Sequence, residues 1–303
     1  MAGIRLYLLE MAASLSERLI YRIRPLLPAS LRPPEMPVVP VVRLTGVIGF
    51  STPLSPGMTM ASVARVLERA FAVRDAKAVA LIINSPGGSA VQSHLIHRRI
   101  RLLAEEAKLP VLVFVEDVAA SGGYMIACAG DEIFADPSSI VGSIGVIGAS
   151  FGFDKLIEKI GVERRVYTAG TRKSMLDPFR PEDPEDVERV KTIQRAIHAK
   201  FIELVKGRRG ARLAAPDDSL FTGEYWEAER AKAFGLIDDI GETRTVLRQR
   251  FGDKVLMPLI SAERTLFGRR LPGFGQAAEV GPGLAADVVS AIEARALWSR
   301  YGL

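Results

Sequence analysis

Two glycine-rich turns could place a nucleophile beside backbone N–H groups. The first covers residues 84–88 (NSPGG) and the second covers residues 120–123 (ASGG). Glycine lets the backbone turn sharply and direct its N–H groups into a cleft. A serine at the first turn of a helix also lies at the positive end of the helix dipole. Ser121 is therefore a candidate nucleophile beside a candidate oxyanion hole. The same turns also fit a structural role or a phosphate cradle, although the sequence has no Gly-x-x-x-x-Gly-Lys-Ser/Thr pattern.

A serine nucleophile needs a base, and histidine is the usual one. The sequence contains His94, His97 and His198. None of them stands beside a glycine turn or a carboxylate partner in a recognisable triad order, which disfavours a Ser/His triad. No pair of histidines is spaced with a carboxylate as a metal site requires, so no metal and no other cofactor is expected.

A lysine can act as the base if it becomes neutral. A free lysine titrates near ~10.4, and burial can lower that value by up to about 3–5 pH units. Lys155, Lys159 and Lys173 are the candidates. The first two fall on the polar side of an expected helix, and spacing alone leaves the choice among the lysines open.

The elements that must position these residues read as alternating strands and helices. Continuous apolar runs predict buried strands at residues 78–83 and 111–115. Further strands are predicted at residues 38–44 and 132–135. Helices are predicted at residues 59–73, 90–107, 151–160, 185–206 and 225–235. This alternation indicates an α/β fold with parallel βαβ units. Ligands of such sheets bind at the carboxyl ends of the strands, where both glycine turns would lie.

The chain divides into three predicted regions. Residues 1–37 form an amphipathic helix and a proline-rich linker, residues 38–262 form the catalytic domain, and residues 263–303 form a Gly/Pro-rich loop and a C-terminal helix at about 284–299. Charges interrupt residues 1–30 before about 18 apolar residues accumulate, so we expect no membrane span there. We expect a helix on a membrane surface or one docked on protein, and a cytoplasmic or peripheral membrane location.

The composition is that of an ordinary globular protein. The 303 residues carry a net charge of +5, and 48% of them are hydrophobic. No basic run with interleaved aromatic residues is present, so no nucleic-acid partner is expected. Cys128 is the single cysteine, so no intrachain disulfide can form. It stands in an apolar run and is expected to be buried.

Residues 115–124 (VEDVAASGGY) closely resemble the nucleophile region of the signal peptide peptidase A-like enzymes, the S49 family of Ser/Lys peptidases. Further similar blocks follow the family order within residues 38–242. They are residues 84–88, 142–146, 170–173 with 178–180, and 231–238. The resemblance implies a ClpP/crotonase-like fold of layered βαβ units with flanking helices.

The resemblance also implies a role for each matched residue. Ser121 would be the nucleophile and Lys173 the base. Ser143 would hydrogen-bond the lysine amine and orient it, and the N–H groups of Gly88 and Gly122 would form the oxyanion hole. The implied reaction is peptide hydrolysis through an acyl-enzyme, without a metal or organic cofactor.

The resemblance further implies the substrates and the assembly. Extended peptides such as signal-peptide remnants, or membrane-associated proteins, would be cleaved by a homo-oligomer with shared active sites, in which Lys173 of one protomer meets Ser121 of its neighbour. Short members of the family usually have a membrane-spanning N-terminal helix, which we do not expect in residues 1–30. Two alternatives remain: a crotonase-fold enzyme acting on acyl-CoA, and a catalytically inactive scaffold at a membrane.

Overall fold

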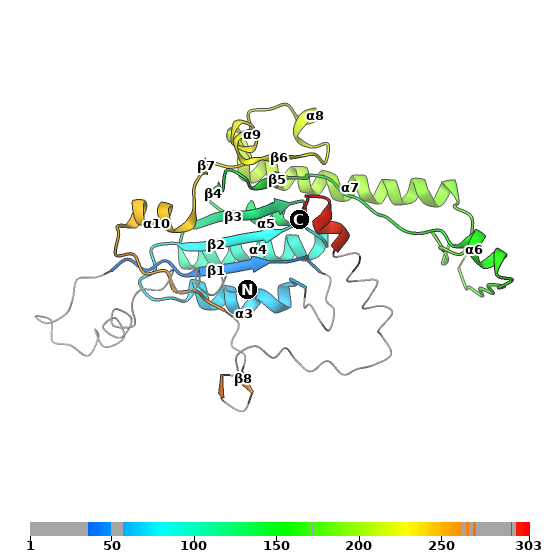
Figure 1. Cartoon of the computed structure of the whole chain (residues 1–303), viewed down its shortest axis with the longest axis horizontal. Helices are drawn as coiled ribbons and strands as arrows, with labels where there is room; N and C mark the ends of the chain where they lie inside the picture. Colours follow the sequence, from blue (N-terminus) through cyan, green and yellow to red (C-terminus); the bar gives the residue numbers. More distant parts are fainter. Residues whose placement is uncertain are drawn as a thin grey trace, which may run out of the picture.

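The computed structural model describes residues 36–49, 57–170, 172–261, 265–266, 269–270, 292 and 295–303. Its centre is a mainly parallel sheet in the order β1-β2-β3-β4-β7, in which β5 pairs with β3 and with β6 (Figure 1). The strands are β1 (Val41–Thr45), β2 (Val79–Ser85), β3 (Val111–Ala120), β4 (Glu132–Ala135), β5 (Ile140–Gly142), β6 (Tyr225–Glu227) and β7 (Asp239–Ile240). A separate two-stranded pair comprises β8 (Thr265–Leu266) and β9 (Arg269–Arg270).

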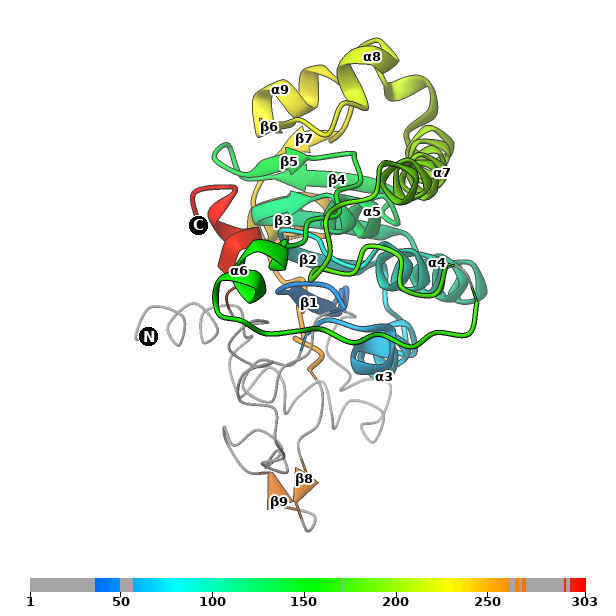
Figure 2. The ribbon, with the colours of Figure 1, turned by 90° about the vertical axis from the view of Figure 1, so that its right-hand side faces the viewer.

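Helices cover both faces of the sheet. The described helices are α3 (Met60–Phe71), α4 (Ala90–Ala107), α5 (Gly122–Ala127), α6 (Asp154–Lys159), α7 (Pro184–Arg209), α8 (Asp217–Leu220), α9 (Ala228–Ala233) and α10 (Thr243–Phe251), with a 3₁₀ turn at Gly210–Arg212. One face packs on α3, α4, α5 and the C-terminal part of α7 (Figure 2). The opposite face packs on Leu247 of α10 and on Val255 and Met257, which follow that helix. Both faces of β2 are buried, which explains its continuously apolar sequence.

The predicted α/β class, with parallel βαβ units and flanking helices, is confirmed. The predictions for α4 and β4 match the observed bounds, and β3 extends five residues beyond the predicted end at 115. Cys128 is buried as predicted, and burial raises the pKa of its thiol to about 12. The thiol therefore has no nucleophilic character near neutral pH.

The helix predicted at residues 225–235 is wrong over its first turn. Residues Tyr225–Glu227 form β6, which pairs antiparallel with β5, and the helix α9 occupies only Ala228–Ala233. Pairing with a strand more than 80 residues away overrides the local pattern.

The predicted terminal helices lie largely outside the described residues. The helix predicted within residues 1–30 lies wholly outside them, and of the helix predicted at 284–299 the described residues 292 and 295–299 are helical. Within the described ranges, no helix is both long enough and apolar enough to cross a bilayer.

A bulge divides β3 and lets its last residues change partners. Ile83 pairs with Val115 but Ser85 pairs with Ala119, so extra residues accumulate on β3 opposite Asn84. Before the bulge β3 pairs with β4, and after it β3 pairs with β5. The Ser139 hydroxyl donates to the carbonyls of Val115, the last paired residue before the bulge, and of Glu116, which lies in the bulge. This hydroxyl therefore satisfies buried carbonyls at the point where β3 leaves β4.

We expect Ser139→Ala to lower the free energy of unfolding by about 1–3 kcal/mol, because it removes the donor of a buried hydrogen bond to these carbonyls. Urea denaturation would measure the loss. Ser138→Ala is the matched control, because Ser138 is exposed and makes its hydrogen bond to Asp136 through its backbone N–H. The control should change stability by no more than about 0.5 kcal/mol. Equal losses in the two variants would contradict the role given to Ser139.

Candidate active site

Ser121 occupies a strained turn between β3 and α5. Its backbone has φ 53° and ψ −120°, a conformation that residues with a side chain rarely adopt and that costs roughly 1–3 kcal/mol. Two hydrogen bonds hold it: its N–H donates to Gly142 O at 2.8 Å, and Met125 N–H donates to Ser121 O at 3.0 Å. The hydroxyl does not cap α5, so the helix start leaves it available for chemistry.

The first glycine turn is held open by Ile48. Ile48 N–H donates to Gly87 O and Ser89 N–H donates to Ile48 O, both at 2.8 Å. This is a parallel bridge around Gly88, so the N–H of Gly88 itself points away from Ile48. A Cβ at Gly88 would lie 2.1 Å from Ile48 O, and the φ of Gly88 is +139°. Only glycine fits at this position, and its free N–H suits an oxyanion hole.

The two glycine turns touch. A Cβ on Gly87 would lie 2.8 Å from the Cβ of Ser121. A Cβ on Gly122 would lie 2.3 Å from the hydroxyl oxygen of Ser93, because α4 and α5 pack closely there. The structure thus brings Ser121, Gly122 and the turn that contains Gly88 to one edge of the sheet, as the sequence predicts. Gly87 was missed as a site residue, because its contact with Ser121 arises only from tertiary packing.

Ser143 follows β5 directly beside the nucleophile turn. Its neighbour Gly142 accepts the hydrogen bond from Ser121 N–H, and Ser143 N–H donates to Glu224 O at 2.6 Å. The side chain of Ser143 faces Tyr301, whose pKa is raised because burial outweighs the opposing effect of Ser143. Tyr301 also packs edge-on against Tyr225, with ring centroids 4.9 Å apart. The C-terminal residues therefore lie at the same end of the sheet as Ser121 (Figure 1).

All three histidines lie in the described part of the chain, and none hydrogen-bonds Ser121. His94 is exposed. His97 is buried, and burial together with nearby Arg208 lowers its pKa to about 4. Nε2 of His198 lies 3.0 Å from the carbonyl oxygen of Ile144, next to Ser143. No local pattern predicts that α7 passes so close to Ser143.

Lys173 does not reach Ser121 within one chain. Its side chain is exposed, and its N–H donates to Gly170 O at 3.2 Å. Its neighbours Arg172 and Ser174 line a cavity of about 1000 Å³ together with the first turn of α6. Pro184, where α7 begins, precedes His198 by about 21 Å at 1.5 Å of helix rise per residue. Figure 1 shows α6 and the start of α7 far from the sheet, and the residues on both sides of Lys173 line the same cavity as the first turns of these two helices.

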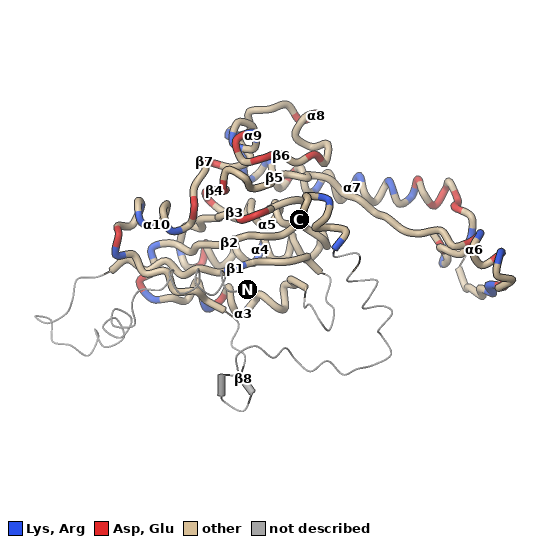
Figure 3. The backbone as a smooth tube through the Cα atoms, viewed as in Figure 1, with Lys and Arg blue, Asp and Glu red and all other residues tan. Residues whose placement is uncertain are grey.

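These distant residues form a projection that we call the arm, defined as residues 145–170 and 172–197. Figure 3 shows basic and acidic residues along it. Large apolar side chains are exposed on the arm, and two of them, Ile193 and Ile197, lie one helical turn apart on α7. The others are Ile147, Phe151, Phe153, Leu156, Ile160, Val162, Tyr167 and Leu176. In α7 only Phe201, Val205 and Arg209 are buried. Clusters of exposed apolar side chains often mark protein–protein contacts.

Comparison with known proteins identifies the family of the chain. Residues 104–254 match the model of Peptidase family S49, and this range contains Ser121, Ser143 and Lys173. The chain belongs to peptidase family S49.

Individual relatives agree with this assignment to different extents. The chain is 34% identical over 214 residues to "Serine protease SPPA, chloroplastic" of Arabidopsis thaliana, covering 67% of this chain and 30% of that protein. It is 54% identical over 288 residues to a Brucella abortus protein named "Na(+)/H(+) antiporter NhaA", covering 93% of this chain and 39% of that protein. The chain thus spans well under half of either relative, and the antiporter name differs from the peptidase family of the matched residues. Among solved structures it is similar to ClpP1 from Listeria monocytogenes, with a TM-score of 0.42 and 16% identity over 68% of this chain and 94% of that one.

The contact between the two turns generates a prediction. Gly87→Ala would force a Cβ against Ser121, so we expect the second-order rate of fluorophosphonate labelling to fall by about 10- to 100-fold. Gly46→Ala is the matched control: its φ of +108° resembles the +101° of Gly87, but nothing lies within 4 Å of the added Cβ. Both variants carry the backbone strain, and only Gly87→Ala displaces Ser121. Equal labelling rates in the two variants would show that the contact with Ser121 does not matter.

Proposed function

We propose that this chain is a serine peptidase in which Ser121 attacks the scissile carbonyl of a polypeptide. The observation that carries the proposal is the strained turn that presents Ser121 directly against the Gly87–Gly88 turn. A phosphate cradle would not need a serine side chain held at this point. Membership of peptidase family S49 supports the same reaction.

The proposed reaction uses a Ser/Lys dyad. The neutral amine of Lys173 takes the proton of the Ser121 hydroxyl as its oxygen bonds to the carbonyl carbon, and then donates that proton to the leaving amine. The N–H groups of Gly88 and Gly122 stabilise the tetrahedral oxyanion. Ser143 orients the lysine amine. Water, deprotonated by the same lysine, then hydrolyses the acyl-enzyme. The reaction requires no metal or organic cofactor.

The lysine comes from a neighbouring protomer in this proposal. Two features support this. The neighbours of Lys173 line a cavity with α6 and the start of α7, which lie far from the sheet in Figure 1, and the arm exposes a series of large apolar side chains. Packing the arm on a second copy would bury those side chains and carry Lys173 toward a Ser121 that is not its own. The active form is then a homo-oligomer with shared active sites.

The substrates and boundaries follow from the same proposal. The proposed substrates are extended peptides, including signal-peptide remnants and segments of membrane-associated proteins, at a cytoplasmic or peripheral membrane location. Residues 38–262 are the proposed peptidase domain, flanked by residues 1–37 and 263–303.

Replacing the nucleophile tests the reaction. We expect Ser121→Ala to abolish fluorophosphonate labelling and to reduce peptide hydrolysis by up to about 10⁶-fold, the loss seen when subtilisin loses its nucleophile. Circular dichroism should show an unchanged fold, because alanine removes a single hydroxyl group. Ser138→Ala is the control and should keep full labelling. Retention of more than a tenth of the activity by Ser121→Ala would refute the assignment.

Mixing two inactive variants tests the shared site. When Ser121→Ala and Lys173→Ala subunits are combined, some interfaces regain an intact Ser121 and an intact Lys173, so part of the activity should return. The control mixture combines Ser121→Ala with the Ser121→Ala/Lys173→Ala double variant and should stay inactive. Lys155→Ala, which removes another exposed lysine of the arm, should keep its activity. Mixed oligomers that form but remain inactive would show that each protomer works alone.

A further inference from the structure

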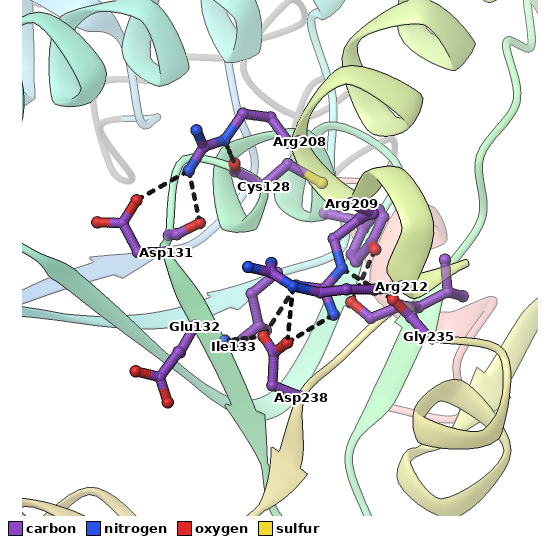
Figure 4. A network of polar contacts seen from close by, with 12 residues as sticks. Cys128, Asp131, Glu132, Ile133, Arg208, Arg209, Arg212, Gly235 and Asp238 are labelled. Carbon is purple, nitrogen blue, oxygen red and sulfur yellow. Dashed lines mark hydrogen bonds and ion pairs between the residues drawn. The ribbon is translucent and has the colours of Figure 1, made fainter. Parts of the chain in front are cut away.

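The C-terminal end of α5 is held by two guanidinium groups. The last carbonyls of a helix have no donor within the helix. Arg208 donates to Cys128 O at 2.8 Å and to Gly130 O at 2.9 Å, and Arg101 donates to Ala129 O at 3.0 Å (Figure 4). Cations at this end are also favoured by the helix dipole. The helix that starts at the nucleophile is therefore fixed at its other end by side chains from α7 and α4.

Asp131 joins these two arginines to the start of β3. Its carboxylate accepts from Arg101 at 2.9 Å, from Arg208 at 3.1 Å and from Val111 N–H at 2.9 Å. Its own N–H donates to Val111 O at 2.8 Å. Since β3 runs out to Ser121 and α5 runs back from it, Asp131 closes this unit at its base while Ser121 lies at its tip.

The same carboxylate connects the elements that carry the three parts of the proposed site. Helix α4 begins directly after the turn that contains Gly88, and its Arg101 bonds Asp131. Helix α5 begins directly after Ser121. Most of helix α7 belongs to the arm, which also contains Lys173. Arg208, near the C-terminal end of α7, hydrogen-bonds both Asp131 and the end of α5.

The next residue of α7 fixes the position of that helix. Arg209 is buried, and it donates to Gly235 O at 2.8 Å and to both carboxylate oxygens of Asp238 at 2.8 and 3.1 Å (Figure 4). The Tyr124 hydroxyl of α5 donates to Leu236 O in the same segment at 2.8 Å. Arg208 therefore extends from a helix turn that cannot slide past α5.

We propose that Arg208 is a positioning residue for the nucleophile: together with Asp131 it aligns α5, and hence Ser121, with the Gly88 turn and with the helix that carries the arm. The inference rests on the proposed peptidase reaction for its catalytic consequence. Charge-assisted bonds from one planar fork to two carbonyls and a carboxylate fix direction as well as distance. A displacement at the base of the β3–α5 unit is carried to its tip, where a shift of 1 Å can cost about 100-fold in rate.

The test compares Arg208→Gln and Arg208→Lys with the wild-type chain, well below the unfolding temperature of each. We expect Arg208→Gln to lower kcat and the fluorophosphonate labelling rate of Ser121 by at least about tenfold, with KM changed less than about twofold. Arg208→Lys should recover part of the rate, because it restores the charge but not the fork. Hydrogen exchange should become faster at the amides of α5, a measurement that does not depend on catalysis.

Arg250→Gln is the matched control. Arg250 forms a two-pronged pair with Glu132 at 2.5 and 2.6 Å, next to Asp131 in sequence, but it joins α10 to β4 and touches none of the three site helices. It should leave the labelling rate and the exchange in α5 unchanged. Two outcomes would overturn the inference and leave the peptidase assignment standing. In the first, Arg208→Gln lowers stability but is labelled at the rate of the control. In the second, hydrogen exchange in α5 stays unchanged. If the wild-type chain shows no Ser121 labelling, the proposed function fails, and the exchange in α5 still decides whether Arg208 holds that helix.

Discussion

The contact between two glycine turns at the carboxyl edge of the sheet controls the rest of the site. Gly87 lies so close to Ser121 that a single added carbon would collide with the nucleophile, and Gly88 lies against the carbonyl of Ile48. This approach requires β2 and β3 to end at the same level and requires α4 and α5 to start side by side. Helices α4 and α5 can start side by side because Gly122 lies against Ser93, where no larger residue would fit. The strain at Ser121 persists because these surroundings leave it no alternative.

Two features of the sheet let β2 and β3 end at the same level. The bulge opposite Asn84 adds length to β3, so that its final residues change partner from β4 to β5. Residue Gly142 at the end of β5 then accepts the N–H of Ser121, and Ser143 follows it directly. A regular strand would have continued beside β4, and Ser121 would not have paired with Gly142, the residue before Ser143. The irregularity in the strand is thus what assembles the candidate site.

The arm differs from the sheet and its helices in how it exposes apolar side chains. The sheet and its helices form a closed core, whereas the arm exposes apolar side chains that a lone chain cannot bury. Its helix α7 is nonetheless attached rigidly, because Arg208 and Arg209 bond α5 and the 235–238 segment at consecutive positions. A rigid attachment at one end and an unpartnered apolar surface at the other suit an element that acts on a second subunit. The proposed origin of the catalytic lysine and the proposed role of Arg208 both depend on this geometry.

The sequence by itself determined the α/β class, most of the strands and helices, and the placement of both glycine turns after buried strands. Those features depend on local apolar periodicity and on turn chemistry, which neighbouring residues reveal. The role of Ser143, and the choice of Lys173 among the lysines, came only from family resemblance, because spacing cannot rank residues that meet through folding. Tertiary structure alone decided that residues 225–227 join β5 as a strand, that Gly87 contacts Ser121, that His198 binds the backbone beside Ser143, and that Asp131 gathers arginines from α4 and α7. Each of these contacts joins residues distant in sequence, and their energies depend on packing that no local pattern encodes.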